Sequence, residues 1–250
     1  MARFSGQIAI VTGGSGGLGA ALCKALVAEG AKVYATAFDQ SRAEQNGRTA
    51  LAAEAGIALE YVDIRQTAEL QEWVGSVRRR EGRIDMLVNA AGVCPLDDWR
   101  DVTETMWDEV FAVNAKAVFF ACQAVLGGMI ERGSGAIVNV GSVAGFNGGL
   151  VTTPAYGASK GAVHTLTKWL AAKAAPSGVR VNAVAPGPFR SAMTDAFTPD
   201  MRERLSRNTP DGKIGEPEDV VQSILFLVDS AASGHITGTT LDVCGGLYMR

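Results

Sequence analysis

Short apolar runs alternate along the chain with longer segments in which apolar residues recur at helical spacing. The runs are rich in β-branched residues and predict buried strands over 8–11, 32–37, 57–62, 84–89, 136–140, 179–185 and 240–243. Helices are expected over 20–30, 41–55, 67–81, 155–175 and 216–229, with one long helix or two over 103–132. This alternation predicts an α/β fold, doubly wound, with a mostly parallel sheet and helices on both faces. Ligands of such sheets bind outside the carboxyl ends of the strands, so the residues after each strand are the candidates for function.

No low-complexity segment, charge block or linker divides the chain, so residues 1–250 are expected to form a single domain. Apolar residues make up 47% of the sequence, enough for a sizeable core, and the net charge of −3 gives no reason to expect nucleic acid or an anionic membrane as a partner. No stretch reaches about 18 uninterrupted apolar residues, so no membrane-spanning helix is expected. The four cysteines are scattered without C-x-x-C spacing, which predicts reduced thiols in a cytoplasmic protein and no zinc site.

A glycine-rich turn separates the first predicted strand from the first predicted helix. Glycines let the backbone approach a pyrophosphate, and the helix N-terminus offers unpaired N–H groups and a positive dipole end to it. The spacing T-G-x-x-x-G-x-G lacks the Lys and Ser or Thr that end a phosphate-transfer loop, which disfavours ATP chemistry. A dinucleotide is therefore predicted to bind at Gly13, Ser15, Gly16, Gly17, Leu18 and Gly19.

An acidic residue follows the second predicted strand. Asp39 lies 20 residues after Gly19, where a carboxylate can accept hydrogen bonds from the adenosine ribose and would repel a 2′-phosphate. No Arg or Lys stands at 14–18 or 36–41, and Arg42 is the nearest. NAD is therefore the favoured cofactor, with NADP as the alternative, and an ordinary turn residue is the structural alternative for Asp39.

Tyr156 and Lys160 stand at i and i+4 of a predicted helix and share one face. A free tyrosine has a pKa of about 10, and a nearby ammonium group favours the phenolate and lowers that pKa. The phenol could then exchange a proton with an alcohol near neutral pH. Ser142, directly after a predicted strand, would bond the substrate oxygen. A Tyr-x-x-x-Lys pair alone is common by chance, but its combination with this serine and the glycine turn predicts a catalytic site.

Other polar residues carry weaker signals. Asn114 sits inside a long apolar helix, where a buried amide needs partners, and an internal cap or kink is the structural alternative. His164 and His235 match no catalytic motif and suggest no metal site. Cys94 follows the fourth predicted strand and is interpreted as a small core residue near the pocket.

These motifs together resemble the short-chain dehydrogenase/reductase family, in particular its 3-oxoacyl-carrier-protein reductase-like branch. The resemblance implies one Rossmann-type domain with a seven-stranded parallel sheet, usually in a homotetramer. It implies hydride transfer between nicotinamide C4 and a carbinol or carbonyl carbon of a small molecule. In the family, the lysine also holds the nicotinamide ribose, and the asparagine holds a water that passes protons to it. The implied catalytic residues are Asn114, Ser142, Tyr156 and Lys160.

The resemblance also assigns cofactor contacts beyond the glycine turn. Besides Tyr156 and Lys160, these are Asp63 and Ile64 at the adenine, Asn89, Ala90, Ala91 and Gly92 beside the cofactor, and Pro186, Gly187, Phe189 and Ser191 near the nicotinamide. In NAD-preferring members the acid falls where Ala37 stands, and the pair Thr36-Ala37 is similar to some NADP-dependent reductases. The Ser–Tyr gap is one residue longer than the commoner spacing, so no substrate is transferred from a relative. A non-catalytic cofactor-binding or scaffold protein is the rival interpretation.

The segment 188–210 lacks a clean strand or helix pattern. It is predicted to be a substrate-covering loop, with Met193, Phe197 and Met201 unpartnered until ligands fill the cleft. An ordinary surface insertion is the alternative.

Overall fold

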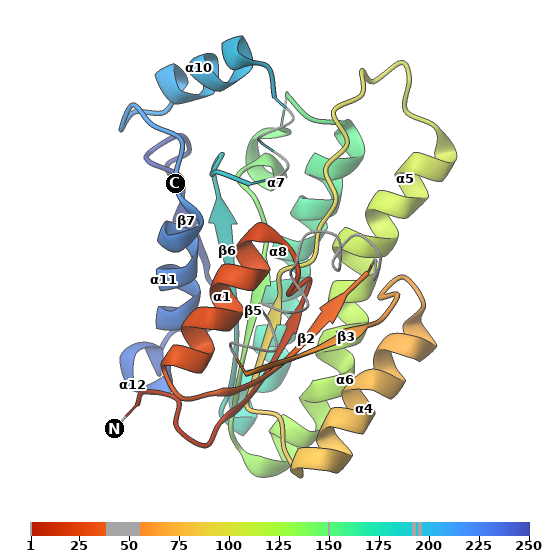
Figure 1. Ribbon diagram of the computed structural model, residues 1–250, viewed down its shortest axis with the longest axis vertical. Helices are drawn as coiled ribbons and strands as arrows, with labels where there is room; N and C mark the ends of the chain where they lie inside the picture. Colours follow the sequence, from red (N-terminus) through yellow and green to blue (C-terminus); the bar gives the residue numbers. More distant parts are fainter. Residues whose placement is uncertain (1, 39–55, 150, 192–193, 195–196) are drawn as a thin grey trace.

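Seven strands pair in parallel, in the order β3-β2-β1-β4-β5-β6-β7, in the computed structural model (Figure 1). The structure describes residues 2–38, 56–149, 151–191, 194 and 197–250. Each predicted strand is present, and its ends differ from the prediction by no more than two residues. The strands are β1 (Ile8–Thr12), β2 (Lys32–Ala37), β3 (Ile57–Tyr61), β4 (Met86–Asn89), β5 (Gly135–Val140), β6 (Val179–Pro186) and β7 (Thr240–Val243).

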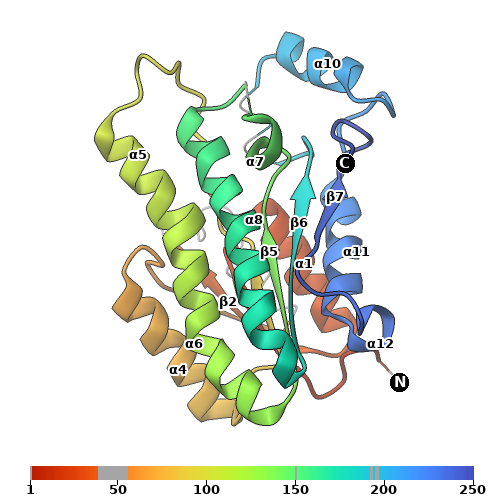
Figure 2. The ribbon, with the colours of Figure 1, turned by 180° about the vertical axis from the view of Figure 1, so that it is seen from behind.

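Helices cover both faces of the sheet, as the alternating pattern predicts. One face carries α1 (Gly17–Ala28) and α11 (Pro217–Val228), followed by the short α12 (Ser230–Ser233). Figure 2 shows the other face, which is covered by α4 (Thr67–Glu81), α5 (Glu104–Phe111), α6 (Ala117–Arg132) and α8 (Pro154–Ala174). Each face has its own buried apolar cluster, so both sides of the parallel sheet are shielded from water. The predicted helix over 41–55 lies outside the described residues.

The helix over 104–132 is continuous, with a π-helical stretch, η1 (Ala112–Lys116), between α5 and α6. It is the one helix in the described part of the chain that is long and apolar enough, by length and composition alone, to cross a membrane. It meets this criterion of length and composition without an uninterrupted run of about 18 apolar residues, which is the feature that the sequence lacks. Val118, Ala121, Cys122 and Met129 lie in the core against the sheet, which is the position of a core helix.

Part of the segment 188–210 is helical, contrary to its predicted loop character. Helix α10 (Pro199–Asn208) begins with Thr198, whose side chain accepts a hydrogen bond from the Met201 amide, and with Pro199 in its first turn. Both are ordinary start signals of a helix. They escape an apolar-periodicity search because α10 has no buried residues. Two further short helices are α7 (Ala144–Asn147) and the 3-10 turn η2 (Ala175–Ser177).

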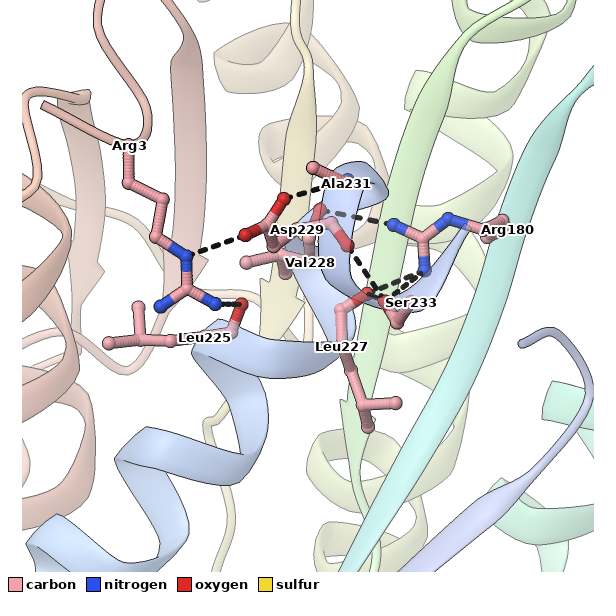
Figure 3. Close-up of polar contacts among 8 residues, drawn as sticks. All are labelled: Arg3, Arg180, Leu225, Leu227, Val228, Asp229, Ala231 and Ser233. Carbon is pink, nitrogen blue, oxygen red and sulfur yellow. Dashed lines mark hydrogen bonds and ion pairs between the residues drawn. The ribbon is translucent and has the colours of Figure 1, made fainter. Parts of the chain in front are cut away.

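A buried arginine ties α11 to the amino end of β6 (Figure 3). Arg180 donates hydrogen bonds to the carbonyls of Leu227 (2.7 Å) and Val228 (3.1 Å), and to the Ser233 hydroxyl (2.9 Å). The last carbonyls of a helix lack intrahelical partners, and a cation there also complements the helix dipole. Arg3 reaches the same helix end from outside, with an ion pair of 2.7 Å to Asp229.

Replacing Arg180 should therefore destabilise the fold far more than replacing Arg3. Arg180→Ala leaves buried carbonyls without donors and should lower the free energy of unfolding by about 3 kcal/mol. Arg3→Ala, the matched control at the same helix end, should cost less than about 1 kcal/mol because its ion pair is partly exposed. Equilibrium urea unfolding at fixed protein concentration measures both. Equal losses in the two variants would contradict this account of α11.

Candidate active site

The carboxyl ends of the strands collect the predicted site residues along one edge of the sheet. β1 lies between β2 and β4, so the order of strands reverses at β1. The glycine turn after β1 therefore meets the segment after β4. A Cβ atom at Gly13 would lie 2.7 Å from Cα of Ala91, and Gly13 has a φ of 76°. Both the close approach and the dihedral angle require glycine there.

Within the turn, the backbone folds back on itself. A Cβ atom at Gly19 would overlap the carbonyl oxygen of Gly13, so only glycine permits this packing. Helix α1 begins directly after Gly16, which supplies no side-chain cap, and its first turn holds no acidic residue. The start of α1 thus carries the helix dipole without a competing side-chain anion, which suits a bound pyrophosphate.

The loop after β6 reaches over this turn. A Cβ atom at Gly17 would lie 4.0 Å from Cβ of Ser191. Gly187 is held against β7 by a hydrogen bond of 2.9 Å from its amide to the Val243 carbonyl. Phe189 forms a backbone bridge with Gly215. The structure thereby brings Ser191, 172 residues away in the chain from Gly19, to the glycine turn.

Within the segment Asn89–Gly92, the first residue stabilises the sheet and the last two lie at the candidate site. Asn89 is buried and donates to the side chain of Asn139 (2.9 Å), which in turn donates to Thr167 (3.0 Å) on α8. This buried chain joins β4, β5 and α8. The side chain of Asn89 is bonded within this chain of buried residues, so Asn89 stabilises the sheet. Ala91 lies against the glycine turn, and Gly92 lies near Lys160.

Asn114 lies in the π-helical stretch and is fully buried. Its amide exchanges two hydrogen bonds of 2.9 Å with the backbone of Val93 and donates a third, of 3.1 Å, to Ser159 on α8. The π-turn thus presents an amide that joins the loop after β4 to α8. Such insertions occur often at functional sites.

Ser142, Tyr156 and Lys160 converge at the tip of β5. The Ser142 side chain lies near enough to the Tyr156 hydroxyl to influence its pKa, and the Ser142 hydroxyl accepts a hydrogen bond from the Ala144 amide at 3.1 Å. Nζ of Lys160 donates to the Val140 carbonyl at 2.8 Å and lies 5.8 Å from the centre of the Tyr156 ring. Lys160 and Ser142 are both buried. The predicted neighbourhood of these three side chains is therefore present.

The electrostatics differ from the expectation that Lys160 would lower the pKa of Tyr156. Burial instead raises the pKa of Tyr156, and the nearby Ser142 side chain opposes this only in part. Burial also lowers the pKa of Lys160 to about 8, so the ammonium keeps most of its charge at neutral pH. Desolvation is the largest influence on the pKa values of both Tyr156 and Lys160. Nζ of Lys160 lies over the face of the Tyr156 ring and donates its hydrogen bond to a backbone carbonyl.

The predicted adenine end is partly described. Asp63 is paired with Arg65 through two hydrogen bonds of 2.9 Å, which hold the pKa of that carboxyl below its usual range. The Arg65 guanidinium lies 4.4 Å from the centre of the exposed Phe38 ring, directly after β2. A search of positions near Asp39 in sequence misses this cation, because the loop after β3 supplies it. Asp39 lies outside the described residues.

One thiol lies beside Lys160 and Tyr156. Cys94 is partly buried, and its charge would interact with both Lys160 and Tyr156. Burial raises the pKa of the Cys94 thiol to about 12, so the thiol stays neutral and is a poor nucleophile. All four cysteines are free, as expected from their scatter.

Known proteins with the same features match nearly the whole chain. A family model described as short chain dehydrogenase matches residues 7–202. Galactitol 2-dehydrogenase (L-tagatose-forming) of Cereibacter sphaeroides is 38% identical, over 98% of this chain and 96% of its own length. A 3-oxoacyl-[acyl-carrier-protein] reductase of Vibrio harveyi is 35% identical, over 99% of both chains. The crystal structure of gox2181 superposes with a TM-score of 0.90 at 34% identity, covering 98% of this chain and 96% of that one.

Proposed function

The chain belongs to the short-chain dehydrogenase family, and we propose that it transfers a hydride between a nicotinamide cofactor and a secondary alcohol or ketone. The resemblance to the 3-oxoacyl-carrier-protein reductase-like branch is confirmed by the 35% identity over 99% of both chains. The observation that carries the proposal is the convergence of Tyr156, Ser142 and Lys160 at the same sheet edge as the glycine turn. The names of the two relatives also describe the interconversion of an alcohol and a ketone.

The residues of the chain fit a dinucleotide. The pyrophosphate would lie on the start of α1, where the backbone approaches closely at Gly13 and Gly19. Ala91 and Gly92 would lie along its path, and the carboxamide end would lie under Ser191. The cofactor, when bound, supplies or accepts the hydride.

Tyr156 would hold the proton that moves to or from the substrate oxygen. Its hydroxyl lies near the Ser142 side chain, so one substrate oxygen placed between them could contact both groups. Ser142 would donate to the negative charge that develops on this oxygen, as an oxyanion-hole donor does. Lys160 would keep a positive charge beside the phenol, and Asn114 would hold the loop and helix that frame them.

For the cofactor, we propose NAD over NADP. The family binds nicotinamide cofactors, and the choice is proposed to depend on Asp39, whose carboxylate would accept from the ribose hydroxyls and repel a 2′-phosphate. The parent should bind NADH more tightly than NADPH, and Asp39→Asn should narrow the gap. Isothermal titration of both cofactors measures this. A parent that binds NADPH better would show that the alternative alignment of the acid at Ala37 is right. Arg65, whose guanidinium lies against Phe38 directly after β2, would then be the candidate cation for the 2′-phosphate.

The segment 188–210 is proposed to cover the substrate. Helix α10 and the buried Phe197 are formed in the ligand-free chain, so the earlier expectation that Phe197 waits for a ligand was wrong. We therefore predict that α10 gains protection as a unit when cofactor and substrate bind, because closure excludes water from the hydride path. Hydrogen exchange of 199–208, apo against ternary complex, measures the effect, with α4 as the internal control. Unchanged exchange in 199–208 would identify a rigid wall.

Assembly and location are proposed from the family resemblance. Relatives are usually oligomeric, and we propose a homotetramer in the cytoplasm. The rival interpretation, a scaffold that binds cofactor without catalysis, is disfavoured because Ser142, Tyr156 and Lys160 are all present and brought together.

A further inference from the structure

His164 lies beneath the serine of the site, although its sequence context matches no catalytic motif. Tyr156, Lys160 and His164 follow one another at four-residue steps, so they share the face of α8 that meets the tip of β5. Nε2 of His164 lies 2.9 Å from the carbonyl oxygen of Ser142. Nδ1 lies 3.4 Å from the hydroxyl of Thr240, at the start of β7. The side chain is 4% exposed.

The partners of this imidazole determine which nitrogen carries the proton. A carbonyl oxygen can only accept, so Nε2 must donate to Ser142, and Nδ1 is then the acceptor of a neutral ring. Burial lowers the pKa of His164, and the charges of Lys160 and Arg250 lower it further. The hydrogen bond to Ser142 and the carboxylate of Asp242 act in the opposite direction. At neutral pH the ring is therefore neutral, with its proton on Nε2.

The ring fits a slot that admits little movement. A Cβ atom at Gly145 would lie 2.7 Å from Nε2, and one at Gly141 would overlap the imidazole carbon between the two nitrogens. Phe146 stacks on the ring, with centroids 4.1 Å apart and an interplanar angle of 9°. The loop that carries Ser142 is thus wrapped around His164, and its two glycines leave the space that the imidazole fills.

The segment after β7 closes this arrangement from the outside. Tyr248 stacks against Phe146, with ring centroids 5.1 Å apart. The Arg250 guanidinium lies 4.5 Å from the centre of the Phe146 ring and forms an ion pair of 3.0 Å with Asp242. The loop after β5 is therefore held between α8 and the end of the described chain.

We propose that His164 is a positioning residue, which holds the hydroxyl of Ser142 against Tyr156 by donating a hydrogen bond to the Ser142 carbonyl. This inference deepens the proposed function and rests on it for its kinetic consequence. Lys160 donates a hydrogen bond to the carbonyl of Val140, two residues before Ser142. Two side chains of α8 therefore bind alternate carbonyls at the end of β5. A tip that is free to shift would misplace the Ser142 hydroxyl, and a displacement of about 1 Å can cost 10²-fold in rate.

Two variants separate positioning from a general loss of structure. His164→Leu removes the donor and fills its place with an apolar side chain, and it should lower kcat ~10- to 100-fold. The alkaline rise in alcohol oxidation should also move to higher pH, because the nearby Ser142 side chain lowers the pKa of Tyr156. His164→Gln, whose amide can donate from the same place, should recover kcat to within about threefold and restore the pH profile. Activity of His164→Leu equal to the parent's, or no recovery in His164→Gln, would overturn the proposal.

A second measurement needs neither cofactor nor substrate, so it tests the inference even if the proposed function fails. The chain has two histidines, and His235→Gln leaves His164 as the sole signal in a ¹⁵N-histidine NMR spectrum. The ligand-free chain at neutral pH should show a protonated Nε2 and an unprotonated Nδ1. The opposite tautomer, or a doubly protonated ring, would overturn it.

Discussion

Tyr156→Phe should lower turnover by at least ~10²-fold while leaving cofactor affinity unchanged. The variant removes only the hydroxyl, which is the group that would exchange a proton with the substrate oxygen, and positioned acid–base groups contribute on this scale. The ring, its contact with Lys160 and the packing of α8 stay in place. Steady-state kinetics with a substrate of the parent, and titration with NADH, measure the two quantities.

The matched control is Tyr34→Phe. This variant also removes one phenol hydroxyl, which donates a hydrogen bond to Glu81 far from the site. Removal of this hydroxyl should leave turnover unchanged. Turnover of Tyr156→Phe within a few-fold of the parent would remove Tyr156 from the mechanism.

The same group predicts a pH dependence. Alcohol oxidation needs the phenolate as base, and burial raises the pKa of Tyr156, so the phenolate fraction grows as pH rises into the alkaline range. kcat/KM for oxidation should therefore increase with pH from neutrality upward. Ketone reduction needs the neutral phenol as acid and should stay flat near neutral pH. Oxidation that already reaches a plateau below neutral pH would show that bound ligands lower the pKa below its ordinary value.

Ser142→Ala has the second largest expected effect. The Ser142 hydroxyl lies near Tyr156 and would donate to the charge on the substrate oxygen, and loss of such a donor costs ~10²-fold in kcat. Ser76→Ala on α4 removes a hydroxyl that bonds only a nearby backbone carbonyl, and serves as the control. Kinetics of both variants with the same substrate check this. Equal kcat in Ser142→Ala and the parent would show that the substrate oxygen binds elsewhere.

The strands and most of the helices could be predicted because apolar periodicity reports burial. The run 136–140 is buried on both faces, and Leu70, Trp73, Val74 and Val77 form the buried face of α4 that their spacing predicts. Helix α10 was missed because it buries none of its residues, so capping at Thr198 was the signal available. The π-turn at Asn114 was beyond reach, because i→i+5 bonding has no sequence period of its own.

The site was predictable where its residues directly follow strands. Gly13, Gly92 and Ser142 lie along one edge of the sheet because parallel strands end there. The directions of the pKa shifts were not predictable, since desolvation depends on packing that i,i+4 spacing does not report. Arg65 and His164 were also missed. Arg65 contacts Phe38 and His164 contacts the Ser142 carbonyl, and both partners are distant in sequence. The one available signal was that His164 continues the four-residue spacing of Tyr156 and Lys160.

The most direct test follows nicotinamide absorbance while the parent and Tyr156→Phe meet a panel of secondary alcohols, sugars, 3-hydroxyacyl esters and steroids, with the matching ketones and both NAD(H) and NADP(H). Our central expectation is that the parent turns over at least one alcohol–ketone pair, and that Tyr156→Phe binds the same cofactor but turns over ~10²-fold more slowly. A parent that binds cofactor and converts no member of the panel would contradict it, and would support the scaffold interpretation instead.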